Sequence, residues 1–247
     1  MFPKFLIQGL ALVLLLSNSL TTLAFRVKQG ETLDYRVIIK SVIHGGNQTV
    51  RVIDAKEKYK GRAAIRIRST VTTVGLVNKL TGYNETEEMI LDAKDFYPLY
   101  LKRATRDRKG RETEEVSFDY GKKIAVRRLV EDNKPEERRV ISLPGIVHDG
   151  LSLQFFLRRK NLKPGSHRLY FYSNGSGRIE GIDYFVRKVR NKLQLGDETY
   201  PEYIEIKSPK VNITILVSND EERYPLIIRK ITKVGKFEAR LVNTKQL

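Results

Sequence analysis

The chain has 247 residues, with 46 Lys and Arg against 29 Asp and Glu, and it contains no Cys. The missing Cys excludes disulfides, thiol catalysis and thiolate metal sites. The formal net charge of +17 predicts either attraction to polyanions or a solvated basic surface without a special partner.

The first 24 residues have the pattern of a secretory signal peptide. Lys4 precedes an apolar block over residues 5–16, and residues 22–24 offer small side chains at the positions that a signal peptidase reads. The block is short for a membrane span, and an uncleaved anchor is the alternative. We therefore predict an exported protein whose residues 25–247 form one β-rich domain with no stable membrane span. Export disfavours nucleic acid as a partner.

The mature part alternates apolar and polar side chains with period two, which is typical of antiparallel strands with one buried face. The first strand is predicted over residues 33–43, and HGGN (44–47) is predicted as a glycine-rich hairpin turn. A second clear strand is RAAIRIRSTV (62–71). Further strands are predicted at 83–91, 99–106, 113–118, 123–130, 138–142, 167–172, 182–190, 203–207, 211–217, 226–233 and 237–242.

About a dozen short strands joined by Gly, Asn, Asp and Pro turns indicate an all-β, mainly antiparallel protein. We expect a curved sheet, half-barrel or barrel, with one short helix. No linker or composition break divides the mature part, so a single domain is the simplest interpretation.

One segment, DGLSLQFFLRRKNLKPG (149–165), breaks this pattern. Asp149 is a candidate N-cap, basic residues 158–160 suit a helix C-terminus, and Pro164 with Gly165 follows as a stop signal. We predict a helix of two to three turns over 149–160, with a buried strand as the alternative. Its role stays open between plain core packing by Phe and Leu side chains and a lid over a cavity.

No catalytic or metal-binding motif is apparent. His44, His148 and His167 lack the spacing of a metal site. The segment SNGSG (173–177) lies between two predicted strands, whereas an activated serine needs a strained strand-to-helix turn.

Adjacent acidic pairs such as Glu87/Glu88 and Glu114/Glu115 point to opposite faces of a strand. The two members of one pair therefore cannot form a two-carboxylate site. Carboxylates from different strands could do so, but the sequence does not show which ones meet. We predict a non-enzymatic protein without a cofactor or a metal.

Three motifs occur in a defined order: QGETLDYRVIIKSVIHGG (29–46), DGLSLQFFLRRKNLKPGS (149–166) and VSNDEERYPLIIRKITKVGKFEARL (217–241). Together they span nearly the whole mature part and resemble an exported bacterial family, the domain-of-unknown-function family 3108. The resemblance implies a periplasmic β-rich fold, similar in outline to the half-barrel lipoprotein carriers of the Lol system, in which a covering helix encloses acyl chains. The name of the family assigns no activity to its members, so the resemblance does not indicate one. This chain departs from the family in its basic balance and its fewer acidic turn residues.

Two hypotheses for function follow. In the first, the curved sheet and its helix hold an acyl chain, a lipid or another apolar envelope component. The candidate ligand-binding residues are Leu151, Phe155 and Phe156 for apolar contacts and Asp149, Arg158 and Arg223 at the mouth of a cavity. The alternative roles of the last three are a helix cap, a helix-end charge and a turn salt bridge. In the second hypothesis, a filled sheet docks through a basic face to an anionic envelope polymer or a partner protein.

Overall fold

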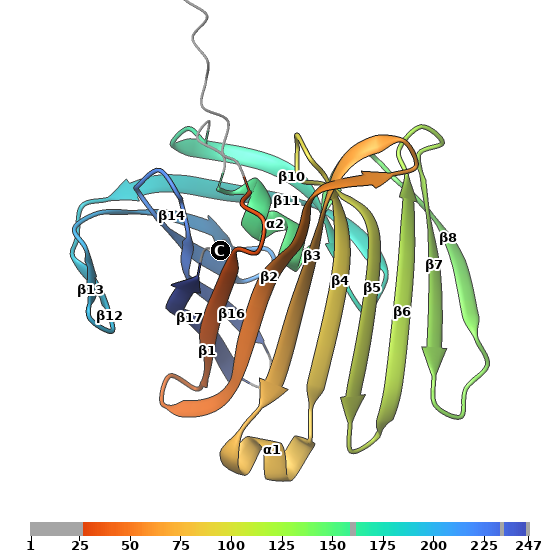
Figure 1. Ribbon diagram of the computed structural model, residues 1–247, viewed down its shortest axis with the longest axis horizontal. Coiled ribbons are helices and arrows are strands. Elements are labelled where there is room, and N and C mark those ends of the chain that lie inside the picture. The colour runs from red at the N-terminus through yellow and green to blue at the C-terminus, as the bar shows by residue number, and fades with distance from the viewer. Residues whose placement is uncertain (1–26, 159–161, 233–234, 246–247) are drawn as a thin grey trace, which may run out of the picture.

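The computed structural model describes residues 27–158, 162–232 and 235–245 (Figure 1). These residues form seventeen strands and two short helices, α1 (Gly75–Thr81) and α2 (Gly150–Phe156). The predicted all-β, mainly antiparallel fold is confirmed. The strands are β1 (Thr32–Ile39), β2 (Ile43–Tyr59), β3 (Arg62–Thr73), β4 (Asn84–Asp92), β5 (Pro98–Asp107), β6 (Gly110–Asp119), β7 (Ile124–Glu131), β8 (Glu137–Ser142), β9 (Val147–His148), β10 (Gly165–Ser173), β11 (Arg178–Val189), β12 (Leu193–Leu195), β13 (Glu198–Tyr200), β14 (Tyr203–Ser208), β15 (Ile213–Ser218), β16 (Pro225–Thr232) and β17 (Gly235–Lys245).

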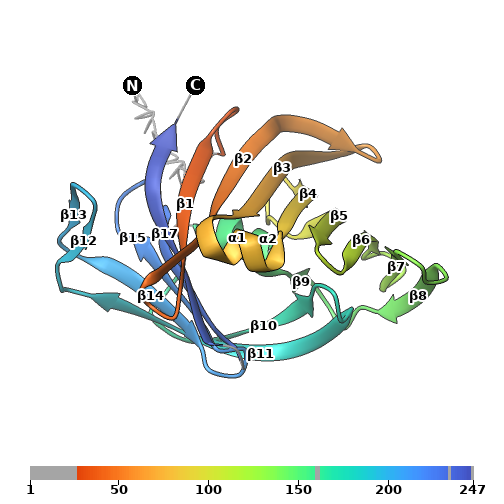
Figure 2. The ribbon, with the colours of Figure 1, turned by 90° about the horizontal axis from the view of Figure 1, so that it is seen from below.

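Fifteen of these strands form one curved sheet, in the order β8-β7-β6-β5-β4-β3-β2-β1-β17-β16-β15-β14-β11-β10-β9. Neighbours pair antiparallel, except that β9 lies parallel to β10. The two end strands, β8 and β9, are joined in sequence by residues 143–146 alone. Seen from below, the sheet curls round so that its two halves face each other across α2 (Figure 2). The remaining strands, β12 and β13, form a separate hairpin.

Helix α2 fills the space between the two halves. Leu151 and Phe155, one turn apart, pack into the larger core cluster with residues of β1–β7, β16 and β17. Leu153 and Leu157 pack into a second cluster with residues of β10, β11, β14 and β15. Burying a Leu or Phe side chain stabilises the fold by roughly 1.5–3 kcal/mol, so α2 joins both halves of the core.

The predicted N-cap of this helix is confirmed. The Asp149 carboxylate accepts hydrogen bonds from the backbone N–H groups of Ser152 (2.8 Å) and Leu151 (3.3 Å). Ser152 Oγ in turn accepts from the Asp149 N–H (2.9 Å), which completes a capping box. These bonds satisfy backbone donors that the first turn of a helix leaves free. The helix spans two turns and ends at Phe156.

The predicted turn at HGGN was wrong. The chain turns at Lys40 and Ser41, which both have positive φ, and HGGN lies inside β2. The glycines here provide space: a Cβ on Gly46 would lie 2.5 Å from the carbonyl oxygen of Thr72. Close approach of neighbouring strands therefore explains Gly46, which also shows why a glycine within a strand pattern can be mistaken for a turn.

Candidate functional site

A pocket of about 650 Å³ lies beside α2, which is a typical size for a small-molecule site. Its walls come from α2, the β4–β5 connection, β9 and the middle of β10, together with the segment before β9. We call this pocket the α2 groove. Its lining residues are Asp95, Tyr97, Ile146, His148, Phe156, Arg168, Leu169 and Tyr170.

The walls of the α2 groove are largely aromatic. The rings of His148 and Phe156 lie 4.3 Å apart at a tilt of 44°, and the Tyr97 ring packs edge-on against Tyr120 at 4.7 Å. His148 is buried, whereas Ile146 at the edge of the groove is 43% exposed. A ligand in the groove would therefore contact ring faces and an aliphatic side chain that is already open to solvent.

Arg168 is the cation among the lining residues of the groove. Its side chain forms no ion pair within the described part of the chain. A Cβ on Gly181, which lies opposite Tyr170 on β11, would lie 3.0 Å from Arg168 Nη2. Likewise, a Cβ on Gly145 would lie 3.2 Å from Tyr170 Cε2. Neither glycine has the positive φ that would require glycine for backbone reasons. Both therefore leave room for the guanidinium and the ring that line the groove.

The structure places one of the six predicted ligand-binding residues in the groove, namely Phe156. Leu151 and Phe155 are 3% and 2% exposed and belong to the core. Beneath α2, the crevice between Leu153, Leu157 and the facing strands has a volume of about 10 Å³, hardly enough for one water molecule. The faces of α2 that contact the two core clusters are thus filled by protein side chains.

The two arginines predicted to bind a ligand, Arg158 and Arg223, have different surroundings. Arg158 is 1% exposed and binds both carboxylate oxygens of Glu31, at 2.5 and 3.0 Å. Its guanidinium also lies 5.0 Å from the Tyr224 ring centroid. Arg223 adopts a positive φ of 50° in the turn before β16, and its N–H donates to Asp220 Oδ1. Neither arginine lines the α2 groove.

Sequence reasoning missed a largely buried polar network where the sheet closes. We call it the seam network, and its members are Glu87, Arg103, Glu114, Arg127, Asp149, Tyr172, Asn174 and Gly175. At its centre, the Glu114 carboxylate accepts from Arg127 Nε (2.7 Å), Tyr172 Oη (2.8 Å) and the Gly175 N–H (2.9 Å). Arg127 also donates to the Gly175 carbonyl at 2.8 Å. These contacts fasten β6 and β7 to the β10–β11 turn. Burial alone would raise the pKa of Glu114, but the hydrogen bonds outweigh it and lower the pKa.

The seam network also brings together two carboxylates from different elements. Asn174 Nδ2 lies 3.4 Å from Glu87 Oε1 on β4 and 3.4 Å from Asp149 Oδ2 at the α2 cap. Burial, followed by the charge of Asp149, raises the pKa of Glu87 well above its usual range. Because Asp149 already accepts from the helix N-terminus, the structure assigns this pair to closing the sheet. Within the described residues, no group of three or more His, Asp or Glu could hold a metal ion.

The fold and its site define a class: a curved, barrel-like antiparallel β protein with an aromatic groove beside an internal helix. No helix in the described part has the length and apolar character needed to cross a membrane. Residues 32–242 match the family described as "Protein of unknown function (DUF3108)". The chain belongs to this family, as the three sequence motifs predict. No curated protein matches the sequence.

Two solved structures are similar to the chain. One is a β-barrel-like protein of the domain of unknown function DUF1849 from Brucella abortus, with 8% sequence identity and a TM-score of 0.54. That match covers 90% of this chain and 99% of the other, and it supports the barrel-like architecture. The second is a DUF1089-family protein from Pseudomonas aeruginosa, with 9% identity over 91% of this chain and 95% of the other. Its TM-score of 0.34 is too low to support a conclusion.

Proposed function

We propose that the protein is an exported binding protein of the cell envelope that takes an anionic amphiphile, such as a fatty acid or another acyl-chain anion, in the α2 groove. Arg168 binds the negatively charged head, and Phe156, Tyr170 and Ile146 contact the apolar part. The observation that carries the proposal is an arginine without an ion pair in the described residues, placed in a pocket of about 650 Å³ with aromatic walls.

The chemistry of the lining residues supports this class of ligand. A planar guanidinium matches a carboxylate or phosphate with two parallel hydrogen bonds. Apolar surface removed from water contributes roughly 25 cal/mol per Å², and the 43% exposed Ile146 offers such surface. The groove lies beside α2, whereas the core under α2 is filled, so an acyl chain is proposed next to the helix and not beneath it.

Ligand binding is tested with the purified mature protein. Lipid is removed, the extract is analysed by mass spectrometry, and the affinity for a fluorescent fatty acid is measured. We expect Arg168→Gln to weaken binding by about tenfold or more, because a hydrogen-bonded charge contact contributes about 1.5–3 kcal/mol. Arg178→Gln is the matched control, since Arg178 is an exposed arginine at the start of β11.

A second variant guards against a folding artefact. Ile146→Ser changes an exposed side chain at the edge of the groove, so the fold should be retained while the affinity falls. A clean extract together with no binding of the fluorescent fatty acid would refute the proposal. Equal affinities of the wild type, Arg168→Gln and Ile146→Ser would refute the location of the site.

Export is the second part of the proposal, and it rests on residues 1–24 as a signal peptide. We expect cleavage after Ala24 and recovery of the mature chain from the periplasmic fraction. Intact mass measurement of the purified protein tests this. A mass that retains residues 1–24, or recovery from the cytoplasm alone, would contradict it.

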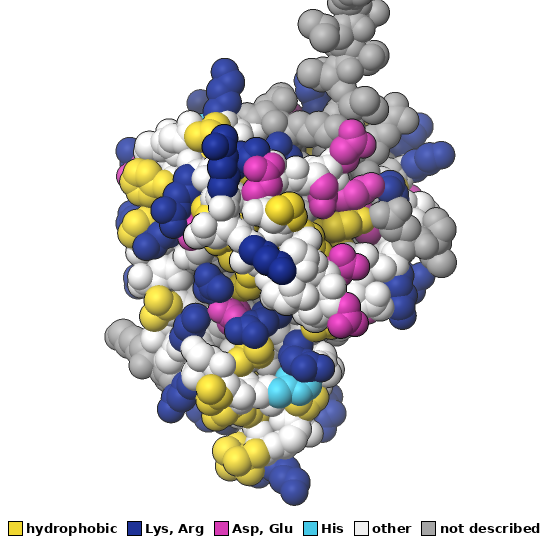
Figure 3. Space-filling model, turned by 90° about the vertical axis from the view of Figure 1, so that its left-hand side faces the viewer, with side chains coloured by type: hydrophobic (Ala, Val, Ile, Leu, Met, Phe, Trp, Pro, Cys, Tyr) yellow, Lys and Arg dark blue, Asp and Glu magenta, His cyan; other side chains and the backbone are white. Residues whose placement is uncertain are grey.

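Docking through a basic face is the second candidate, favoured by the net charge of +17. On the face shown in Figure 3, Lys and Arg side chains are spread over the surface and interspersed with acidic groups. Salt distinguishes the two functions, because electrostatic docking weakens steeply as ionic strength rises. Fatty-acid binding that persists at high salt favours the groove, and loss of all envelope binding at high salt favours docking.

A further inference from the structure

We propose a second anion site, independent of the α2 groove, in which Lys230 and Lys210 bind the phosphate group of a phosphate monoester. The site is a cavity of about 560 Å³ bounded by the end of β10, the start of β11, the β14–β15 connection and the end of β16. We call it the Lys230 cavity. The lining residues used below are Phe171, Ser173, Lys210, Asn212, Lys230 and Ile231.

Lys230 carries the central observation. It is half-buried on β16, where its cross-strand neighbours are Ile213 and Phe237. Its ammonium group has no hydrogen bond or ion pair with any other residue of the described ranges. Burial without a compensating acid lowers the pKa of Lys230. A half-buried charge without a partner costs free energy, and an anion in the cavity would remove that cost.

The other polar groups of the cavity suit an oxyanion. Lys210 Nζ donates to the Gly181 carbonyl at 2.9 Å and lies 3.6 Å from Glu180, the carboxylate that lines the cavity. Glu180 therefore offsets one of the two amines and leaves a net positive charge. The Asn212 amide and the Ser173 hydroxyl add neutral donors. Two ammonium groups with neutral donors are a set that phosphate oxygens accept from.

The cavity also has an apolar side, which is why we infer a phosphate monoester instead of free phosphate. Phe171 is 9% exposed and Ile231 is 56% exposed, and both line the cavity. An organic group attached to the phosphate would cover Ile231 and gain the free energy of that burial.

Pyridoxal 5′-phosphate is a suitable probe, because it combines a phosphate monoester, an aromatic ring and an aldehyde. The Lys230 amine adds to the aldehyde carbon, water leaves, and an imine forms. Borohydride then delivers hydride to the imine carbon and leaves a stable secondary amine, which peptide mass spectrometry locates. We expect Lys230 to be labelled several-fold faster than the exposed lysines. Inorganic phosphate should protect it, and pyridoxal, which lacks the phosphate, should label it more slowly.

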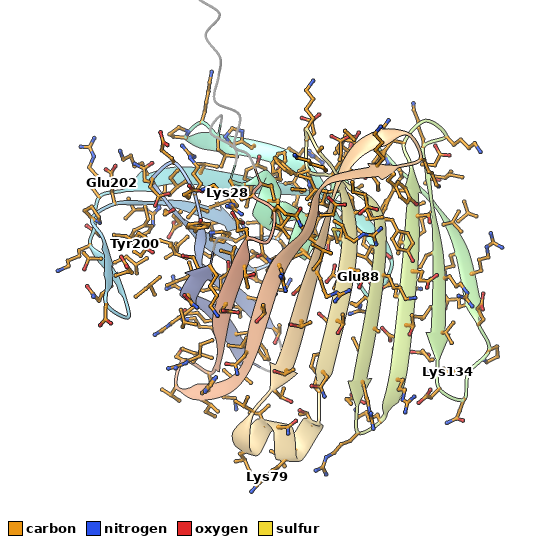
Figure 4. The ribbon with its side chains drawn as sticks, in the orientation of Figure 1. Lys28, Lys79, Glu88, Lys134, Tyr200 and Glu202 are labelled. Atoms are coloured by element: carbon orange, nitrogen blue, oxygen red, sulfur yellow. The ribbon has the colours of Figure 1, made fainter. Side chains whose placement is uncertain are left out.

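Binding without labelling is measured by titrating inorganic phosphate and a phosphate monoester into the protein. Lys230→Met should abolish the signal, whereas Lys79→Met should not. Lys79 is an exposed residue of α1 that points away from the body of the protein (Figure 4). Circular dichroism verifies that both variants fold. Labelling spread evenly over the lysines, or binding unchanged in Lys230→Met, would overturn the site.

The two proposed sites can be tested independently of each other. Arg168→Gln should leave phosphate-monoester binding unchanged, and Lys230→Met should leave fatty-acid binding unchanged. Loss of both activities in either single variant would contradict the independence of the two sites.

Discussion

Glu31 and Arg158 form a buried, bidentate ion pair between residues 127 positions apart in the sequence. Both side chains are 1% exposed. Glu31 directly precedes β1, and Arg158 directly follows the C-cap of α2. Arg158 Nε also donates to the Glu222 carbonyl at 3.2 Å. The pair therefore fastens the end of the internal helix to the start of the first strand and to the turn before β16.

Removing one member of this pair is expected to destabilise the protein strongly. Arg158→Met or Glu31→Gln alone leaves an uncompensated buried polar or charged group, so each should lower the free energy of unfolding by about 3–5 kcal/mol. The double variant should lose less than the sum of the two. Urea denaturation of the four proteins measures this. Lys28→Met is the control, because the side chains of the Lys28–Glu222 pair are 44% and 35% exposed and the pair should contribute about 0–1 kcal/mol. Strictly additive losses would contradict the coupling.

Because the seam network closes the sheet, removing one of its hydrogen bonds should destabilise the protein. Tyr172→Phe removes the hydroxyl that donates to Glu114 at 2.8 Å and should lower the free energy of unfolding by about 1.5–3 kcal/mol. Tyr100→Phe is the control, since that half-buried tyrosine has no hydroxyl hydrogen bond in the described ranges. A loss no larger than that of the control would show that the hydroxyl contributes little to closure.

The raised pKa of Glu87 predicts that the protein loses stability as the pH rises. Burial and then the neighbouring Asp149 raise the pKa of Glu87 in the folded state, with Glu85 adding to the effect and Arg103 opposing it. The folded state therefore holds this proton more tightly than the unfolded state. The resulting stability is complete below the ordinary glutamate pKa of about 4.3 and is lost as the pH rises through the folded-state value. Glu87→Gln should flatten this part of the profile, measured by urea denaturation from about pH 4 to about pH 9. Parallel curves for the variant and the wild type would contradict the assignment.

The lowered pKa of Glu238 predicts the opposite dependence, a loss of stability as the pH falls. Burial would raise its pKa, but hydrogen bonds from Arg229 and Arg240 outweigh burial and lower the pKa to about 2. Its contribution to stability is present above the ordinary glutamate pKa and is lost as the pH falls through about 2. Glu238→Gln should therefore be less stable than the wild type at neutral pH, and the difference should shrink in acid. A difference that is independent of pH would rule out this ion-pair origin.

Most strands could be predicted because apolar and polar side chains alternate along them, and α2 because its cap and apolar residues occur together. The strands β9, β12 and β13, of two or three residues each, are too short to show such a pattern and were missed. Helix α1 was missed: it buries no residue, and Leu76 and Leu80 are 69% and 67% exposed, so it has no core-facing stripe to detect. The α2 groove combines side chains from three separate parts of the chain, residues 95–97, 146–156 and 168–170. The strands next to Tyr97 do not pair with β10, so no hairpin pattern in the sequence could show that Tyr97 and Tyr170 line the same pocket.

The seam network did leave a signal in the sequence. Glu87 shares its strand face with Met89 and Leu91, and Glu114 with Val116 and Phe118, all of them buried. A carboxylate on the apolar, buried face of a strand needs a hydrogen-bond or charged partner that is also buried. Which partner it finds could not be deduced, because Arg127, Tyr172 and Asn174 come from other elements.

The pairing of β1 with β17 has a consequence for how the molecule is assembled. The first and last strands of the described residues are neighbours in the middle of the fifteen-strand order, so the sheet stays in two separately paired parts until β17 has been synthesised. Until then β1 and β16 each have an unpaired edge whose backbone groups could pair with another chain. A truncated product lacking β17 would expose both edges at once and should aggregate rather than merely lose stability.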